Sequence, residues 1–150
     1  MTGIVQRVQR AAVQVSGETV GAIEHGLILY LGIFADDTDF DAEILARKVA
    51  NLRIFCDENE KMNRSVLDVG GGVLVISNFT LCADTKKGNR PSFSHAMLPQ
   101  QANEMYMRFA DNLRKNGIIE VETGVFGADM KVNAFCDGPI NIILNTAIWR

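Results

Sequence analysis

The run from Gly26 to Phe34, GLILYLGIF, constrains the fold more than any other part of the chain. It is apolar without alternation, so both of its faces must be covered, which predicts a central buried strand. Upstream, residues 3–9 and 11–15 alternate moderately between apolar and polar types. A turn at Ser16-Gly17-Glu18 precedes another apolar run that ends at Ile23, and this order predicts a hairpin before the buried strand.

Two helices are predicted, far apart in the chain. The first begins near Thr38, because Thr38 and Asp41 have the spacing of a capping box. Its apolar face consists of Ile44, Leu45, Val49 and Leu52. The second follows Pro99, a residue suited to the first turn of a helix, and ends before Gly117. Its apolar stripe consists of Ala102, Met105, Tyr106, Phe109 and Leu113.

Most of the remaining segments are strand-like. Gly70-Gly71-Gly72 predicts a tight turn into the strand VLVIS, which residues 79–83 are expected to continue after a bend. Residues 84–99 are rich in glycine and proline and predict an exposed loop. Strands are predicted again in IIEVET, DMKVNAF and INIILN. Because the helices do not alternate with strands in regular βαβ units, we expect an α+β fold: one domain over residues 1–150, with largely antiparallel, barrel-like β-sheets and two helices.

Composition places few limits on function. The 150 residues carry a net charge of −3, and the longest apolar run is too short to cross a bilayer. The three cysteines, Cys56, Cys82 and Cys136, have no CxxC spacing, which favours a reducing compartment and hence the cytoplasm. Cys82 and Cys136 are expected to be small buried residues.

The catalytic motifs of common hydrolases and nucleotide-binding enzymes are missing from the sequence. It contains no HExxH, no GxSxG and no P-loop motif. His25 and His95 are the only imidazoles, and a surface position is the simpler interpretation of both. With two histidines and scattered cysteines a zinc site is not expected, and neither a metal nor a cofactor is predicted.

Six segments, which together span nearly the whole chain, carry a resemblance to a known family. The longest is ISNFTLCADTKKGNRPSFSHAM at residues 76–97. The others are QRV at 6–8, NLRIF at 51–55, KMNRSVLDVGG at 61–71, FGADMKV at 126–132 and CDGPIN at 136–141. Together they resemble the D-aminoacyl-tRNA deacylases. The chain departs from the family pattern where Asn78 replaces Gln, Cys136 replaces Asn and Asn141 replaces Thr.

The resemblance implies a cytosolic homodimer that hydrolyses the ester between tRNA and a D-amino acid or glycine, with no membrane or DNA partner. It implies that Ser77, Asn78, Phe79 and Thr80 line the catalytic pocket. The main-chain N–H groups of Phe79 and Thr80 would stabilise the charge that develops on the ester carbonyl oxygen, and the tRNA 2′-hydroxyl would assist the attacking water. Taken without the resemblance, Ser77 and Thr80 would be interpreted as partners of strand-end hydrogen bonds.

The same resemblance gives Gly138-Pro139 a role in selectivity. In the family this peptide bond is cis, and the dipeptide from one subunit reaches into the pocket of the other, where an L side chain would collide. Arg7 would help to fix the dipeptide, while Phe126 and Met130 match pocket positions. The plainer alternatives are an ordinary Gly-Pro turn, a surface arginine, and two core side chains.

Lys86, Lys87 and Arg90 form the one local cluster of cations and are candidates for contact with tRNA phosphates. A solvated loop is the alternative interpretation. Two rival functions stay open for the chain. It could bind RNA without catalysis, if the departures at Asn78, Cys136 and Asn141 abolish activity. It could also hydrolyse a different small ester or amide.

Overall fold

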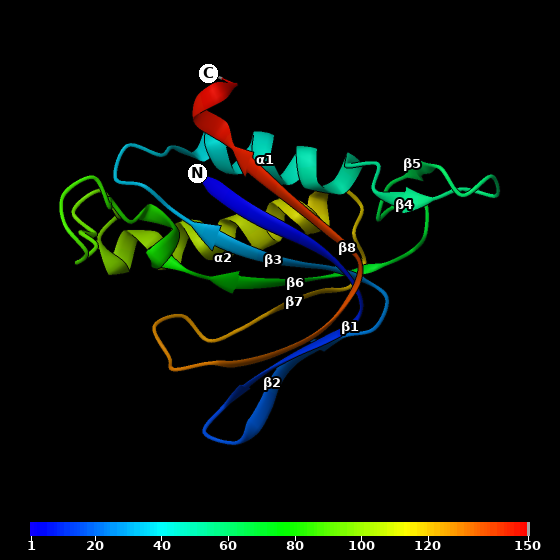
Figure 1. The fold of residues 1–150 in the computed structure, drawn as a ribbon, viewed down its shortest axis with the longest axis horizontal. Coiled ribbons are helices and arrows are strands. Elements are labelled where there is room, and N and C mark those ends of the chain that lie inside the picture. Colours follow the sequence, from blue (N-terminus) through cyan, green and yellow to red (C-terminus); the bar gives the residue numbers. More distant parts are fainter. Residues whose placement is uncertain (150) are drawn as a thin grey trace.

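A computed structural model describes residues 1–149 as a curled mixed sheet with two helices packed along one side (Figure 1). The strands are β1 (Thr2–Val15), β2 (Glu18–Ile23), β3 (Gly26–Gly32), β4 (Phe55–Cys56), β5 (Met62–Arg64), β6 (Gly72–Ser77), β7 (Val121–Thr123) and β8 (Lys131–Asn145). The helices are α1 (Asp39–Asn51) and α2 (Pro99–Lys115), with short 3-10 helices η1 (Phe79–Cys82) and η2 (Thr146–Ile148). Neither long helix in this part of the chain is apolar and long enough to span a membrane.

The main sheet has the order β2-β1-β3-β6-β7, and β8 pairs with β1 along most of its length. The three pairings made by β1 are antiparallel, as predicted. The prediction of a largely antiparallel sheet is wrong for β3, β6 and β7, which run parallel. The physical reason lies in the connections: α1 and α2 bring the chain back to the same end of the sheet before the next strand starts.

The long strand β1 bends the sheet toward a barrel. Its first half, Thr2 to Val8, pairs with β3, and its second half, from Ala11, pairs with β2. The pairing with β8 shifts register on both sides of Val8, and such irregularities curve a sheet. As a result one apolar core lies between the sheet and the helices, and a smaller one fills the inside of the curled part.

Both helices form where their sequence pattern predicts them. Thr38 and Asp41 make the capping box of α1, and Pro99 is the first residue of α2. All five residues of the predicted α2 stripe are buried. After α2, Gly117 has a φ of +99°, a conformation that glycine adopts without a steric penalty. The two helices therefore cover the face of the sheet that carries the larger core.

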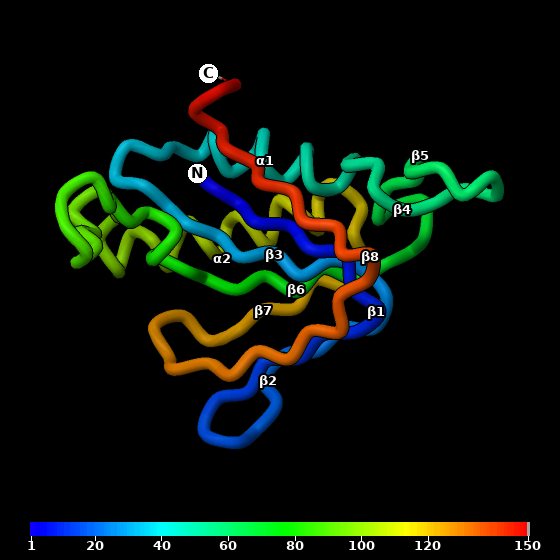
Figure 2. Tube along the Cα trace, viewed as in Figure 1, coloured from blue at the N-terminus to red at the C-terminus, as the bar shows by residue number. Residues whose placement is uncertain are grey.

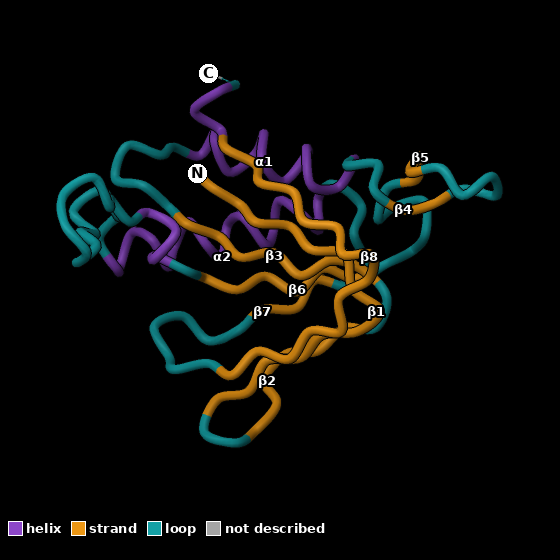
Figure 3. Tube along the Cα trace, viewed as in Figure 1, coloured by secondary structure: helices purple, strands orange, loops and turns teal. Residues whose placement is uncertain are grey.

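Three other predictions are wrong. Residues 79–82 form the 3-10 helix η1 and do not continue β6. The last two predicted strands are the single strand β8, which runs through Gly138 and Pro139 without a break (Figure 3). Cys136 is exposed, because the outer face of β8 is not covered within one chain, whereas Cys82 is buried as expected.

Tyr106→Phe tests the core beneath the sheet. The buried Tyr106 hydroxyl donates to the Val75 carbonyl at 2.7 Å, and its loss should lower the free energy of unfolding by about 1 to 2 kcal/mol. Burial raises the pKa of Tyr106 to about 12. Since that pKa is about 10 in an unfolded chain, wild-type stability should fall as the pH rises from 10 toward 12. Urea unfolding checks both effects; an equally steep alkaline loss in the variant would contradict the assignment.

Candidate active site

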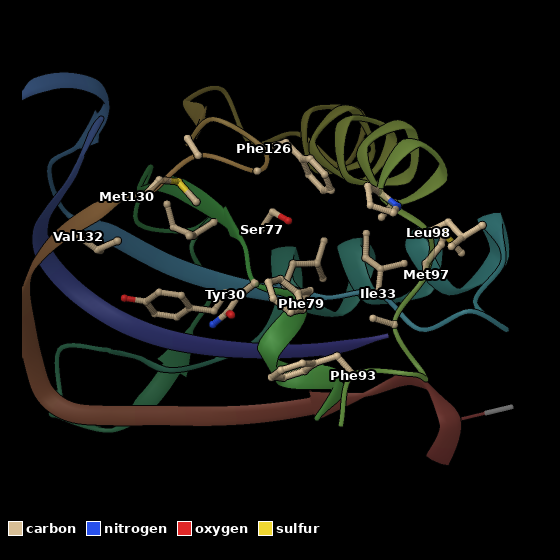
Figure 4. Close-up of a pocket in the computed structure, with 18 residues that line it drawn as sticks. Tyr30, Ile33, Ser77, Phe79, Phe93, Met97, Leu98, Phe126, Met130 and Val132 are labelled. Carbon is tan, nitrogen blue, oxygen red and sulfur yellow. The ribbon is translucent and has the colours of Figure 1, made fainter. Parts of the chain in front are cut away.

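The end of the sheet at which β3 and β6 terminate holds a cavity of about 670 Å³ (Figure 4). Its floor comes from the ends of β3 and β6, and its walls come from the loop before α2 and the loop between β7 and β8. Figure 2 shows that the chain leaves β6 and β7 at the same end, so their loops can enclose one space. The lining residues are Tyr30, Leu31, Ile33, Ile76, Ser77, Asn78, Phe79, Phe93, Ala96, Met97, Leu98, Pro99, Ala102, Phe126, Gly127, Ala128, Met130 and Val132.

The cavity lining is electrically neutral. None of these residues is an acid, a lysine, an arginine, a histidine or a cysteine. The only titratable side chain is Tyr30, and its pKa is raised, mainly by burial and secondly by the nearby Cys136 thiol. Among residues 1–149, no group of three or more acidic, histidine or cysteine side chains could hold a metal ion. Any charge that develops on a substrate inside this cavity must therefore be met by neutral hydrogen-bond donors.

The turn after β6 lies beside the cavity and leaves two main-chain N–H groups without an acceptor inside η1. The Asn78 N–H donates to the Leu31 carbonyl at 2.8 Å, which ties the end of β6 to β3. The chain then enters η1, where the Leu81 N–H donates back to the Asn78 carbonyl at 3.2 Å. Phe79 and Thr80 occupy the first two positions of this helix, so their N–H groups have no acceptor inside it.

Side chains at this turn are engaged with one another. The Thr80 hydroxyl donates to the side-chain oxygen of Asn78. Ser77, Asn78 and Phe79 line the cavity, as does the predicted pair Phe126 and Met130. Thr80 follows them at the mouth and is exposed. Its hydroxyl therefore contacts an amide, which is not a base able to activate it as a nucleophile.

Sequence reasoning missed several lining residues. Tyr30 belongs to the apolar run at residues 26–34, which predicts only a buried strand. Phe93, Met97 and Leu98 belong to residues 84–99, which predict only an exposed loop. The loop is held beside β3 because the Met97 N–H donates to the Ile33 carbonyl at 3.0 Å. No local pattern reveals this pairing, since it joins residues that are far apart in the chain.

Gly138 and Pro139 lie apart from this cavity. Their peptide bond is cis, as the resemblance implied, and both residues are exposed on β8. Arg7 is buried beside them: its Nε donates to the Asp137 carbonyl at 3.3 Å and lies 3.2 Å from the Asp137 carboxylate. Its Nη1 donates to the Ile54 carbonyl at 2.8 Å. The predicted site residues thus form two groups within one chain, one in the cavity and one on the outer face of β8.

The predicted basic residues lie in a third place. Lys86, Lys87 and Arg90 are exposed in the loop between η1 and α2. The base of this loop is closed by reciprocal main-chain hydrogen bonds between Asp84 and Ser92, at 2.8 and 2.9 Å. The next residue, Phe93, lines the cavity, so the cationic loop begins at the cavity rim.

Comparisons with known proteins agree along nearly the whole chain. A family model described as D-Tyr-tRNA(Tyr) deacylase matches residues 4–145. A protein named D-aminoacyl-tRNA deacylase from Koribacter versatilis is 53% identical over 146 residues, which cover 97% of each chain. A protein of the same name from Thermodesulfovibrio yellowstonii is 51% identical over 146 residues, which cover 97% of this chain and 99% of its own.

Two solved structures share the fold. One is titled c-Myc DNA Unwinding Element Binding Protein; it has a TM-score of 0.92 and 42% identity and covers 97% of this chain and 98% of its own. The other is titled as a structural analysis of a probable eukaryotic D-amino acid tRNA deacylase. It has a TM-score of 0.81 at 17% identity and covers 96% of this chain and 99% of its own.

Proposed function

The chain belongs to the D-Tyr-tRNA(Tyr) deacylase family, and from this premise we propose that it hydrolyses the ester that joins a D-amino acid, or glycine, to tRNA. The observation that carries the proposal is a neutral cavity lined by Ser77, Asn78 and Phe79, beside which the N–H groups of Phe79 and Thr80 have no acceptor within η1. Ester hydrolysis builds negative charge on one oxygen, and preorganised neutral donors stabilise that charge strongly. The site therefore suits acyl transfer to water better than chemistry that needs a charged side chain.

In the proposed reaction the ester carbonyl oxygen accepts hydrogen bonds from the N–H groups of Phe79 and Thr80. Water adds to the carbonyl carbon, and the 2′-hydroxyl of the terminal adenosine helps to remove its proton. The bond between this carbon and the ribose oxygen then breaks, and the ribose oxygen takes up a proton. Free tRNA and a free D-amino acid leave. Each main-chain donor contributes on the order of 100-fold or more to the rate in sites of this kind.

Selectivity in the proposal depends on a homodimer. Gly138 and Pro139, which we call the chiral gate, would enter the cavity of the partner subunit and block the space that an L side chain needs. Two observations support this arrangement. The gate lies outside the cavity of its own chain, and the outer face of β8 exposes large apolar side chains, with Ile143 72% exposed. Such a surface is expected to be covered by another copy.

Arg7 would act as a positioning residue for the gate, because it binds the carbonyl and the carboxylate of Asp137, next to Gly138. Lys86, Lys87 and Arg90 would contact phosphates of the acceptor end. These contacts carry no base specificity, which suits an enzyme that serves many tRNAs. Aminoacyl-tRNA is used in the cytoplasm, so we place the reaction there.

The decisive test compares ester loss from D-tyrosyl-, L-tyrosyl- and glycyl-tRNA. We expect the D-tyrosyl and glycyl esters to be hydrolysed at least about 100-fold faster than the L-tyrosyl ester. Tight binding of tRNA without ester loss would favour the non-catalytic RNA-binding protein. Equal turnover of a simple D-tyrosine ester without tRNA would favour the small-ester hydrolase. Duplex DNA serves as the control competitor and should not inhibit.

Thr80→Val separates main-chain catalysis from a nucleophilic threonine. Valine keeps the shape of the side chain and the N–H group but removes the hydroxyl that contacts Asn78. If the main chain does the work, kcat for D-tyrosyl-tRNA should fall less than about 10-fold, because loss of a true nucleophile costs several orders of magnitude. Single-turnover kinetics measure this. A loss of 1000-fold or more would reject the main-chain mechanism.

A further inference from the structure

We propose that Phe79 and Phe93 form a stacking site for the nucleobase that precedes the terminal adenosine, an inference that rests on the proposed function. The two rings make an edge-to-face contact, with centroids 5.0 Å apart and an interplanar angle of 73°. Phe79 is 58% exposed, although it is a large apolar side chain. Figure 4 shows the pair on the opposite side of the cavity from Phe126. We call this pair the aromatic step.

The size of the cavity suits one aminoacyl-adenosine and favours a position outside it for the next nucleotide. Pockets of about 300 to 1000 Å³ hold one drug-sized molecule, and this cavity measures about 670 Å³. An aminoacyl-adenosine fills such a space, so the preceding nucleotide must lie at the rim. Both rings of the aromatic step line the cavity, and the exposed ring of Phe79 also faces solvent, as expected of a side chain at that rim.

The charges beyond the step suit a nucleic-acid strand. Phe93 directly follows the Asp84–Ser92 closure of the loop that exposes Lys86, Lys87 and Arg90. A strand that leaves the cavity would therefore meet the aromatic step first and the cations next. Sites for single-stranded nucleic acid combine these two features, since bases stack on rings while cations contact phosphates. The step would add affinity without reading the identity of the base.

The test uses D-tyrosyl esters of adenosine and of the dinucleotide cytidylyl-adenosine. The readout is the ratio of kcat/KM for the dinucleotide ester to that for the adenosine ester, so a general loss of activity cancels. We expect a ratio of about 10 for wild type, from one stacked base. Phe93→Leu should reduce it to about 1 to 2, while Phe93→Tyr, which keeps an aromatic face, should retain it. Phe40→Leu is the control, because Phe40 is an exposed phenylalanine that does not line the cavity.

A wild-type ratio near one, or an unchanged ratio in Phe93→Leu, would overturn the stacking site while leaving the deacylase function intact. If the wild-type protein does not hydrolyse D-tyrosyl-tRNA, the proposed function itself is overturned. The molecular mass of the Phe93→Leu variant in solution, which reports whether it is a dimer, provides a further check. If this substitution separates the subunits, the rings are a protein contact and the stacking site is rejected.

Discussion

Pro139→Ala should raise the rate of L-tyrosyl-tRNA hydrolysis at least about 10-fold. The rate of D-tyrosyl-tRNA hydrolysis should fall by a much smaller factor. The expectation follows from the position of the chiral gate, which is exposed on β8 and lies outside the cavity of its own chain. Because the gate acts by steric exclusion of the L side chain, its removal should change the rate for the L substrate more than the rate for the D substrate. Ester loss from the two tRNAs, measured side by side, gives the ratio. Pro91→Ala, an exposed proline in the cationic loop, should leave the ratio unchanged.

Mixed dimers show whether the gate works on the partner. One chain would carry Pro139→Ala together with Ala128→Trp, which fills its own cavity, and the other chain would be wild type. The only open cavity would then face the altered gate, so L-tyrosyl-tRNA should be hydrolysed although the active chain is unchanged. Equal losses on both substrates, or a wild-type protein that is monomeric in solution, would contradict the gate.

Gly26→Ala should lower the free energy of unfolding by about 3 kcal/mol or more. Gly26 and Gly72 are paired in the parallel ladder of β3 and β6, and a methyl group on Gly26 would overlap the Gly72 carbonyl oxygen. Main-chain atoms cannot rotate away as a side chain can, so the two strands would have to separate. Because these strands carry Tyr30 and Ser77 to the cavity, kcat should fall as well. Urea unfolding measures the first effect.

Gly3→Ala is the matched control for this substitution. Gly3 also lies in the sheet, but its added methyl group would meet only side-chain ends, that of Leu29 at 3.0 Å and that of Leu45 at 3.8 Å. These side chains can adjust, so the cost should stay below about 1 kcal/mol. Equal destabilisation by both substitutions would show that the close approach of β3 and β6 at Gly26 is not the cause of the loss in free energy of unfolding.

The helices could be predicted from the sequence because their determinants are local. The cap at Thr38, the proline at position 99 and the stripe around Phe109 lie within a few residues of the structure they specify. The direction of β6 could not be predicted, because pairing order depends on how α1 folds back over the sheet. Residues 79–82 are as apolar as a strand, yet the Leu81 N–H donates back to the Asn78 carbonyl, and this turn ends β6 before them.

The candidate site was only partly visible in the sequence. The resemblance pointed to the turn at residues 77–80 and to Gly138-Pro139. It did not reveal that Tyr30 and Phe93, from distant segments, share the same cavity. From the sequence, Cys136 is expected to be a small buried residue. It is exposed because no other part of the described residues covers the outer face of β8.

The neutral lining of the cavity has an evolutionary consequence. In the proposed mechanism the donors are main-chain N–H groups, which every residue type except proline has, so the mechanism does not depend on which other side chains occupy residues 78 to 80. Replacements such as Asn78 can accumulate there while the path of the chain is kept. Purifying selection should then act most strongly on the supports of that path, the glycines and the interstrand bonds, and a search for invariant reactive side chains would overlook enzymes of this type.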